Sequence, residues 1–191
     1  MAVLITNTNP NVRSTIAALT LTFAFDCTGG NYLLVPCRDE AGSTITGVTY
    51  NGVALSQLAF ADRSTGGMRL YMYGLLNPAT GSNNVIITRT GASNRIDGFA
   101  AAVSGAKTTQ PANTFSGNNG TSTTTSGTIM TTTLNEGVFG LQLADNGGDT
   151  AGANTTIISQ TPFGDLNFTR STVFPTATAQ NVTLIVQSGV A

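Results

Sequence analysis

The sequence contains no histidine and no tryptophan, and Lys107 is its only lysine. Histidine is the side chain that most often takes and gives a proton near neutral pH, because its unperturbed pKa is about 6.5. A serine nucleophile in this chain would have no histidine to activate it, and the Gly-x-Ser-x-Gly motif of serine hydrolases is also missing. We therefore predict that the protein is not an enzyme and needs no cofactor.

Charged residues are scarce as well. They make up 9% of the sequence, against about 25% in a typical soluble domain, whereas 40% of the residues are hydrophobic. So low a fraction of charged residues predicts that other molecules cover much of the surface. The few basic residues form no run that would bind nucleic acid, and no segment approaches the roughly 20 apolar residues of a membrane span. The chain begins without a basic, signal-like segment, so we expect synthesis and folding in a cytoplasm.

Alternating apolar and polar residues predict β-strands through much of the chain. The clearest pattern runs from Leu19 to Phe25, where every second residue is Leu or Phe. Asn51-Gly52 lies between two apolar segments and predicts a type I′ hairpin turn, because both residues accept a positive φ. Further strands are expected at residues 69–76, 85–88, 96–103, 138–143, 166–174 and 182–187.

About ten or eleven short strands with Gly, Asn and Ser turns are typical of an all-β fold. We expect an antiparallel β-sandwich, jelly-roll-like, forming a single domain over residues 1–191. Residues 1–14 are a candidate N-terminal arm. Residues 116–133, rich in Thr, Ser and Gly, are either a surface loop leading into a Thr-rich strand or an arm that contacts a neighbouring subunit. In the second interpretation Gly117, Thr121, Thr123 and Thr125 belong to the contact arm.

The two cysteines, Cys27 and Cys37, flank a Gly29-Gly30 turn. Pairing of strands across that turn would bring the two thiols close, but sequence alone cannot place their Cα atoms within bridging distance. Free buried thiols are the favoured interpretation, because a cytoplasmic protein usually stays reduced, and a disulfide is the alternative. A metal site is disfavoured, since two thiols without histidine partners make a poor zinc site.

Two other groups of residues are candidates for binding. Asp145 and Asp149 flank Asn146-Gly147-Gly148 and could supply oxygen ligands to calcium, although the distant glutamate of an EF-hand loop is missing. A solvated loop is the favoured interpretation there, so we predict no metal. Tyr71 and Tyr73 alternate along one strand and therefore share a face. That face is expected in the core or an interface, with glycan stacking as the alternative.

The segment Val48-Thr49-Tyr50-Asn51-Gly52-Val53 forms one motif, and Leu75-Leu76-Asn77-Pro78 before a Gly and a Val-Ile-Ile strand forms another. With the surrounding block from Ile45 to Thr90, they resemble a β-sandwich pattern of tailed-phage virion proteins, although bacterial surface sandwiches show similar patterns. The resemblance transfers no catalytic residue. It implies a capsid decoration (cement) protein or another accessory structural protein of a phage particle.

Composition and resemblance together predict a non-enzymatic component of a phage virion, most simply a decoration protein that binds across capsomers and stabilises the shell. Its expected partners are the capsid protein and further copies of itself, for example in a trimer, with no nucleic acid and no membrane. Two structural alternatives are a glycan-binding head or tail fibre module and a subunit of a tail tube or filament. A glycosidase that uses two carboxylates is the enzymatic alternative.

Overall fold

The computed structural model describes residues 3–40, 43–62, 67–91, 94–106, 124–130, 137–143, 150–160, 166–171 and 179–185. These residues form antiparallel strands and turns but no helix, and hence no helix that could cross a membrane. The chain divides into two compact units, whereas one core was expected from the sequence. The N-terminal unit is Leu4–Asn113, and the C-terminal unit combines Met1–Val3 with Thr114–Ala191. Among the described residues, every strand pair joins two strands of the same unit.

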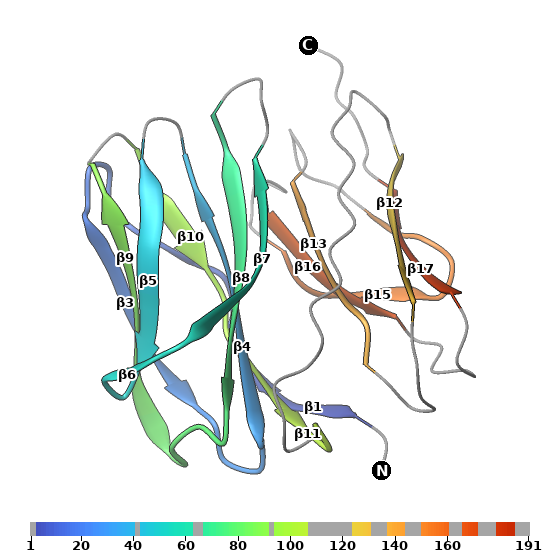
Figure 1. Ribbon diagram of the computed structural model, residues 1–191, viewed down its shortest axis with the longest axis horizontal. Coiled ribbons are helices and arrows are strands. Elements are labelled where there is room, and N and C mark those ends of the chain that lie inside the picture. Colours follow the sequence, from blue (N-terminus) through green and yellow to red (C-terminus); the bar gives the residue numbers. More distant parts are fainter. Residues whose placement is uncertain are drawn as a thin grey trace. The chain divides into compact units, whose positions relative to one another are not determined.

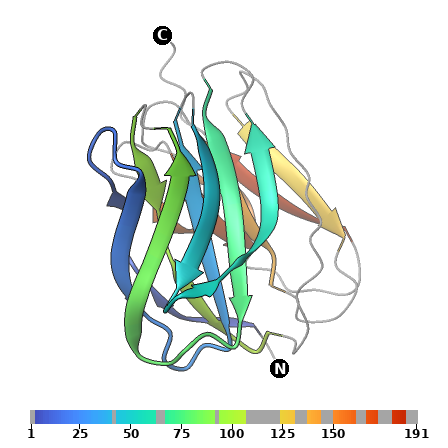
Figure 2. The ribbon, with the colours of Figure 1, turned by 60° about the vertical axis from the view of Figure 1, so that its left-hand side comes forward.

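The N-terminal unit contains two antiparallel sheets, which Figures 1 and 2 show from two directions. In sheet A, β4 is central, with β8 and then β7 on one side and the short strands β10 and β11 on the other, followed by β2 and β1. Sheet B has the order β3-β9-β5-β6. The strands are β1 (Leu4–Thr8), β2 (Val12–Arg13), β3 (Thr20–Asp26), β4 (Tyr32–Asp39), β5 (Thr44–Tyr50), β6 (Val53–Ala54), β7 (Ser56–Asp62), β8 (Arg69–Leu76), β9 (Ser82–Thr90), β10 (Ile96–Gly98) and β11 (Ala101–Ser104).

The core lies between these two sheets and follows from the alternation of residues along each strand. In β3, Leu21, Phe23 and Phe25 are buried while the residues between them are exposed, as the sequence predicts. Strand β8 has the predicted bounds and is buried on both faces over most of its length. Strand β4, which has no such alternation, is buried at every position. Its unbroken apolar run from Tyr32 to Val35 is typical of a strand covered on both faces.

The predicted hairpin turn is confirmed. Asn51 and Gly52 connect β5 to β6 and have φ angles of 49° and 76°, as a type I′ turn requires. After β6 the chain continues through Leu55 into β7, and so passes from the edge of sheet B to the edge of sheet A (Figure 1). One segment thereby forms an edge strand in each sheet on the same side of the sandwich.

We expect Gly52→Ala to lower the free energy of unfolding by about 1–2 kcal/mol, because an L-residue is strained at positive φ. No heavy atom lies within 4 Å of the position that a Cβ would take at Gly52, so crowding does not contribute. Gly47→Ala is the matched control, because Gly47 also has open space around it and its φ is not positive. Urea unfolding of both variants checks this. Equal losses in the two would contradict the backbone explanation.

The C-terminal unit contains two three-stranded antiparallel sheets, with the orders β12-β17-β14 and β13-β16-β15. Phe139 and Phe168 stack with their ring centroids 5.8 Å apart. Leu166, two residues before Phe168, is fully buried. The predicted strands at 138–143, 166–174 and 182–187 correspond to β13, β16 and β17, within the residues described. The strands are β12 (Thr124–Met130), β13 (Phe139–Leu143), β14 (Thr150–Ala151), β15 (Thr155–Gln160), β16 (Leu166–Ser171) and β17 (Ala179–Ile185).

The candidate N-terminal arm at residues 1–14 contributes two strands to sheet A instead. Strand β1 pairs with β11, and β2 pairs with β10. Asn9 adds a side-chain bond, since its Oδ1 accepts a hydrogen bond from the backbone N–H of Ala100. Backbone pairing with a strand 93–100 residues later in the chain was not visible in the sequence, because residues 4–8 show no strong alternation.

Candidate functional site

The polar feature that stands out in the N-terminal unit is a cluster of buried arginines and carboxylates where β4 and β9 end. Arg38, Asp39, Arg89 and Asp97 are at most 4% exposed. No sequence pattern marks these residues as a group, because they come from distant segments. A signal was present for one of them: Val85, Ile87 and Arg89 alternate along β9, so the arginine continues the inward-facing row of that strand.

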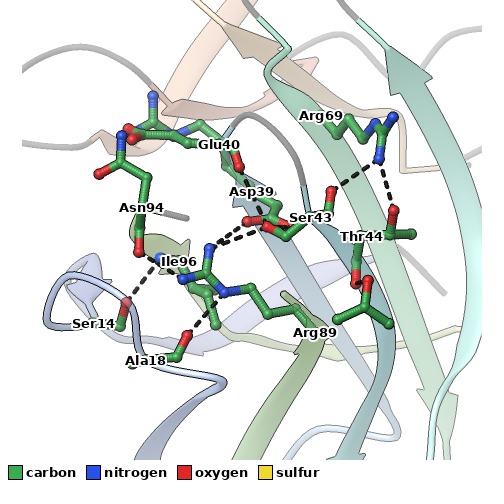
Figure 3. Close-up of polar contacts among 12 residues, drawn as sticks. Ser14, Ala18, Asp39, Glu40, Ser43, Thr44, Arg69, Arg89, Asn94 and Ile96 are labelled. Carbon is green, nitrogen blue, oxygen red and sulfur yellow. Dashed lines mark hydrogen bonds and ion pairs between the residues drawn. The ribbon is translucent and has the colours of Figure 1, made fainter. Parts of the chain in front are cut away.

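Arg89 connects the two sheets. Its Nη1 donates to Asp39 Oδ1 of β4 at 2.7 Å and to Ser43 Oγ at 3.2 Å (Figure 3). Ser43 Oγ in turn donates to Asp39 Oδ2 at 2.6 Å. The side chains of Arg89 and Asp39 are both fully buried. A charge-assisted bond of this length in a buried setting is strong, so it joins sheet B to sheet A at this end of the sandwich.

The same guanidinium also fixes two connecting segments. Arg89 Nε donates to the carbonyl oxygen of Ala18 at 2.8 Å, and Nη2 donates to that of Asn94 at 2.6 Å. The backbone N–H of Ala17 donates to the same Asn94 oxygen at 2.9 Å, which holds Ala17 at a φ of 64°. Arg89 therefore holds the β2–β3 and β9–β10 connections together as well as the two sheets.

A second group lies across three neighbouring strands of sheet A. Asp97 of β10 is opposite Arg38 of β4 and Arg13 of β2 in the strand register. Arg38 Nη2 and Arg13 Nε each lie 2.6 Å from a carboxylate oxygen of Asp97. Arg38 Nη2 also donates to Glu40 Oε1 at 2.6 Å. The carboxylate of Asp97 is fully buried between the two guanidiniums, so each charge is compensated.

This arrangement suits a structural role better than acid–base catalysis. A guanidinium does not release its protons at any ordinary pH, so arginine is a poor general acid or base. Asp39 and Asp97 are buried and bonded to arginines, so neither carboxylate faces a substrate from solvent. The cluster holds strands in register and sheets together.

Tyr71 and Tyr73 lie on one face of β8, as predicted, and that face is the core. They are 2% and 4% exposed, and their ring centroids are 6.3 Å apart. Tyr73 Oη donates to Gln57 Oε1 of β7 at 3.2 Å, and burial raises the pKa of Tyr73 to about 12. The glycan-stacking alternative is not supported at these residues, because a sugar needs an accessible ring face.

Cys27 and Cys37 are free, buried thiols. The strands on either side of the Gly29-Gly30 turn do not pair with each other, so that route to a disulfide is wrong. Cys27 follows β3 of sheet B, whereas Cys37 belongs to β4 of sheet A. The chain crosses between the sheets at this turn. Burial raises the pKa of both thiols above the ordinary value, so both are protonated at neutral pH.

We expect the free energy of unfolding to fall as the pH rises above about 9, because the unfolded chain then ionises its thiols while the folded chain keeps Cys37 protonated. The stabilisation from the raised pKa of Cys37 is complete at a pH below the thiol pKa of the unfolded chain. It is lost as the pH rises toward the thiol pKa of the folded protein. Urea titrations at several alkaline pH values check this, with Cys37→Ala expected to show a shallower fall. Identical slopes in the two proteins would contradict it.

Several predicted residues lie wholly or partly outside the described structure. Asp145 and Asp149, Gly117, Thr121 and Thr123 fall outside it, so the calcium candidate and most of the contact arm stay predictions. Thr125 lies in β12, where its backbone pairs with Leu184 of β17. Residues 124–130 of the Thr-rich segment thus form a strand of the C-terminal unit. Within the described ranges, no three acidic, histidine or cysteine residues gather where they could hold a metal ion.

Comparison with protein-family models, with curated proteins and with solved structures found no match. The interpretation of function therefore depends on the fold, on the cluster of buried charges and on the surface of this chain.

Proposed function

We propose that the protein is a non-enzymatic structural component of a phage particle, and specifically a decoration protein that binds across capsomers and stabilises the shell. The observation that carries the proposal is the strand order of the N-terminal unit. Opposite β3-β9-β5-β6, sheet A contains β2, β10, β4 and β8 in that order, with β7 beyond β8. Strands β5 and β6 form a hairpin within sheet B. Two interlocked Greek keys produce this order, which supports a jelly-roll assignment. Viral capsid proteins and lectins use jelly rolls.

Fold alone does not establish a role, so the surface matters as well. Large apolar side chains are exposed at several points of the described N-terminal unit. These are Leu4, Ile16, Leu19, Val53 and Phe60. With 9% charged residues in the sequence, this surface suits burial against other proteins better than free solution.

The edge of the C-terminal sheet that contains β12 offers a further place for contact. Strand β12 pairs with β17 over seven consecutive residues and has no second strand partner in the part of the chain described. Its sequence, Thr-Thr-Ser-Gly-Thr-Ile-Met, contains no charge and no proline to block pairing. A strand of a capsid protein can add to such an edge by β-augmentation.

The test is binding to purified capsids that lack their accessory proteins. We expect saturable occupancy at symmetry-related positions and shells that withstand a higher temperature. A variant without residues 117–123 tests the contact arm, because the deletion ends before β12 begins at Thr124. Its control carries a Gly/Ser segment of the same length. Equal capsid binding by the wild type, the deletion variant and the Gly/Ser variant would show that residues 117–123 are not a contact arm. No binding by the folded wild type would overturn the decoration proposal.

The rival functions predict different results in the same preparation. A tail tube or filament subunit assembles into long particles without shells. A fibre module binds cell-surface glycans on an array. In that case the glycan site does not include Tyr71 and Tyr73, because both are buried. A carboxylate glycosidase degrades polysaccharide, and the pairing of Asp39 and Asp97 with arginines gives that alternative no support at this cluster.

A further inference from the structure

Strand β3 is an edge of sheet B that lacks the usual protection against pairing with another strand. It is seven residues long and pairs with β9 at every position without a register shift. The other edge strands of the N-terminal unit differ: β1 and β7 contain register shifts, and β2 and β6 have two residues each. Bulges and short length are common ways to blunt an edge. Strand β3 has neither, and no lysine or proline.

The backbone groups that point away from β9 can be assigned from the hydrogen bonds at both ends of the strand. The N–H of Arg89 donates to the carbonyl oxygen of Leu19, and the N–H of Cys27 donates to that of Gly81. Because alternate residues of a strand direct their backbone groups to opposite sides, the odd-numbered residues face β9. Thr20, Thr22, Ala24 and Asp26 therefore direct their N–H and C=O groups to the free edge.

One of these four positions is already used. Asn7 Nδ2 donates to the carbonyl oxygen of Asp26 at 2.9 Å. At Thr20, Thr22 and Ala24, no residue of the described structure donates to or accepts from the outward backbone groups. Their side chains are exposed, uncharged and compatible with a strand. The available edge is thus a three-residue set centred on Thr22.

We propose that two copies of this chain associate by antiparallel pairing of their β3 edges, with Thr22 on the two-fold axis. In this register Thr22 lies opposite Thr22 of the second copy, and Thr20 lies opposite Ala24. Each copy supplies three N–H and three C=O groups, one of each from Thr20, Thr22 and Ala24, and the pairing forms six hydrogen bonds. Sheet B then continues from one copy into the other.

A second copy is the occupant that the charges and the neighbouring surface favour. Asp26, the only charged residue of β3, falls outside the paired positions, so no like charges meet. The net charge of −1 gives two copies little long-range repulsion. Leu19 directly precedes the strand and Ile16 lies four residues before its first residue. They are 53% and 63% exposed and add apolar surface near the start of β3. The pairing is isologous, and so it builds dimers.

Charge reversal on the axis tests both the edge and the register. Thr22→Lys and Thr22→Glu each place two like charges opposite one another, so each variant alone is expected to dimerise at least about tenfold more weakly than wild type. An equimolar mixture of the two variants is expected to recover dimers, all containing one chain of each kind. Sedimentation velocity over a concentration series, with native mass spectrometry of the mixture, measures both effects.

Thr88→Lys is the matched control. Thr88 is exposed on the same sheet and lies opposite Thr20, but it belongs to the inner strand β9, and dimerisation of this variant is expected to match wild type. Circular dichroism shows whether each variant is folded. A monomeric wild type, a trimer, or unchanged dimerisation of Thr22→Lys would overturn the proposal, and so would a mixture that forms no mixed dimers. The proposal does not depend on capsid binding. A protein that forms these dimers but does not bind capsids would refute only the decoration function.

Discussion

Replacing Asp39 by Asn is expected to lower the free energy of unfolding by about 3–5 kcal/mol, because it leaves the guanidinium of Arg89 buried without its counter-charge. Both side chains are fully buried, and Arg89 Nη1 lies 2.7 Å from Asp39 Oδ1. Asn keeps the size of the side chain, so the loss reports the charge and not a cavity. The chain lacks tryptophan, and its four tyrosines all lie in the N-terminal unit. Near-UV circular dichroism of tyrosine during urea unfolding therefore follows this unit alone.

Asp62→Asn is the matched control for this experiment. Asp62 also pairs with an arginine, Arg69, at 3.1 Å, but the side chain of Asp62 is 43% exposed. An exposed ion pair contributes about 0–1 kcal/mol, since water screens the two charges. A loss for Asp39→Asn no larger than that for Asp62→Asn would show that the buried pair does not hold the two sheets together.

Tyr71→Ala is expected to cost about 3–5 kcal/mol of unfolding free energy, which is typical of an aromatic residue removed from a core. The ring of Tyr71 lies between Phe60, at a centroid distance of 5.1 Å, and Tyr73, at 6.3 Å. The same variant separates a core residue from a glycan-binding residue. A binding residue on the surface would lose ligand affinity while the free energy of unfolding changed little. Urea unfolding of the unliganded variant makes the distinction.

Phe60→Ala serves as the control for the aromatic row. Phe60 touches Tyr71 but is 41% exposed, so folding removes less apolar surface from water at this position than at Tyr71. We therefore expect the free energy of unfolding to fall by roughly 1 kcal/mol. Equal stability losses for Phe60→Ala and Tyr71→Ala would contradict the placement of the core face on β8. A Tyr71→Ala protein as stable as wild type would return that residue to the list of glycan-binding candidates.

Local patterns predicted much of the secondary structure. The alternation of Leu21, Phe23 and Phe25 predicted the inner face of β3, and Asn51-Gly52 predicted the turn between β5 and β6. Both predictions depend on residues close in sequence, where the period of two and the φ preference of each residue act directly. Leu19 was an exception, because it continues the alternation but is 53% exposed just before the strand begins.

The charged cluster was not predicted, because its partners are far apart in sequence. Asp97 and Arg38 are separated by 59 positions, and Arg89 and Asp39 by 50. Single acidic residues near turns are common on protein surfaces, so no local pattern indicates that these four residues pair. Only the register of β4 with β10, and the contact of Arg89 of β9 with Asp39 of β4, show that the charges compensate one another.

The sequence by itself determined that this chain forms many short antiparallel strands, that its turns lie at Asn and Gly, and that it lacks the histidine of common acid–base catalysis. The tertiary structure decided that the chain forms two units, that Cys27 and Cys37 belong to different sheets, and that Tyr71 faces the core. The physical reason is that strand formation follows local side-chain alternation, whereas the sheet a strand joins and the face it buries depend on hydrogen bonds and packing with distant segments.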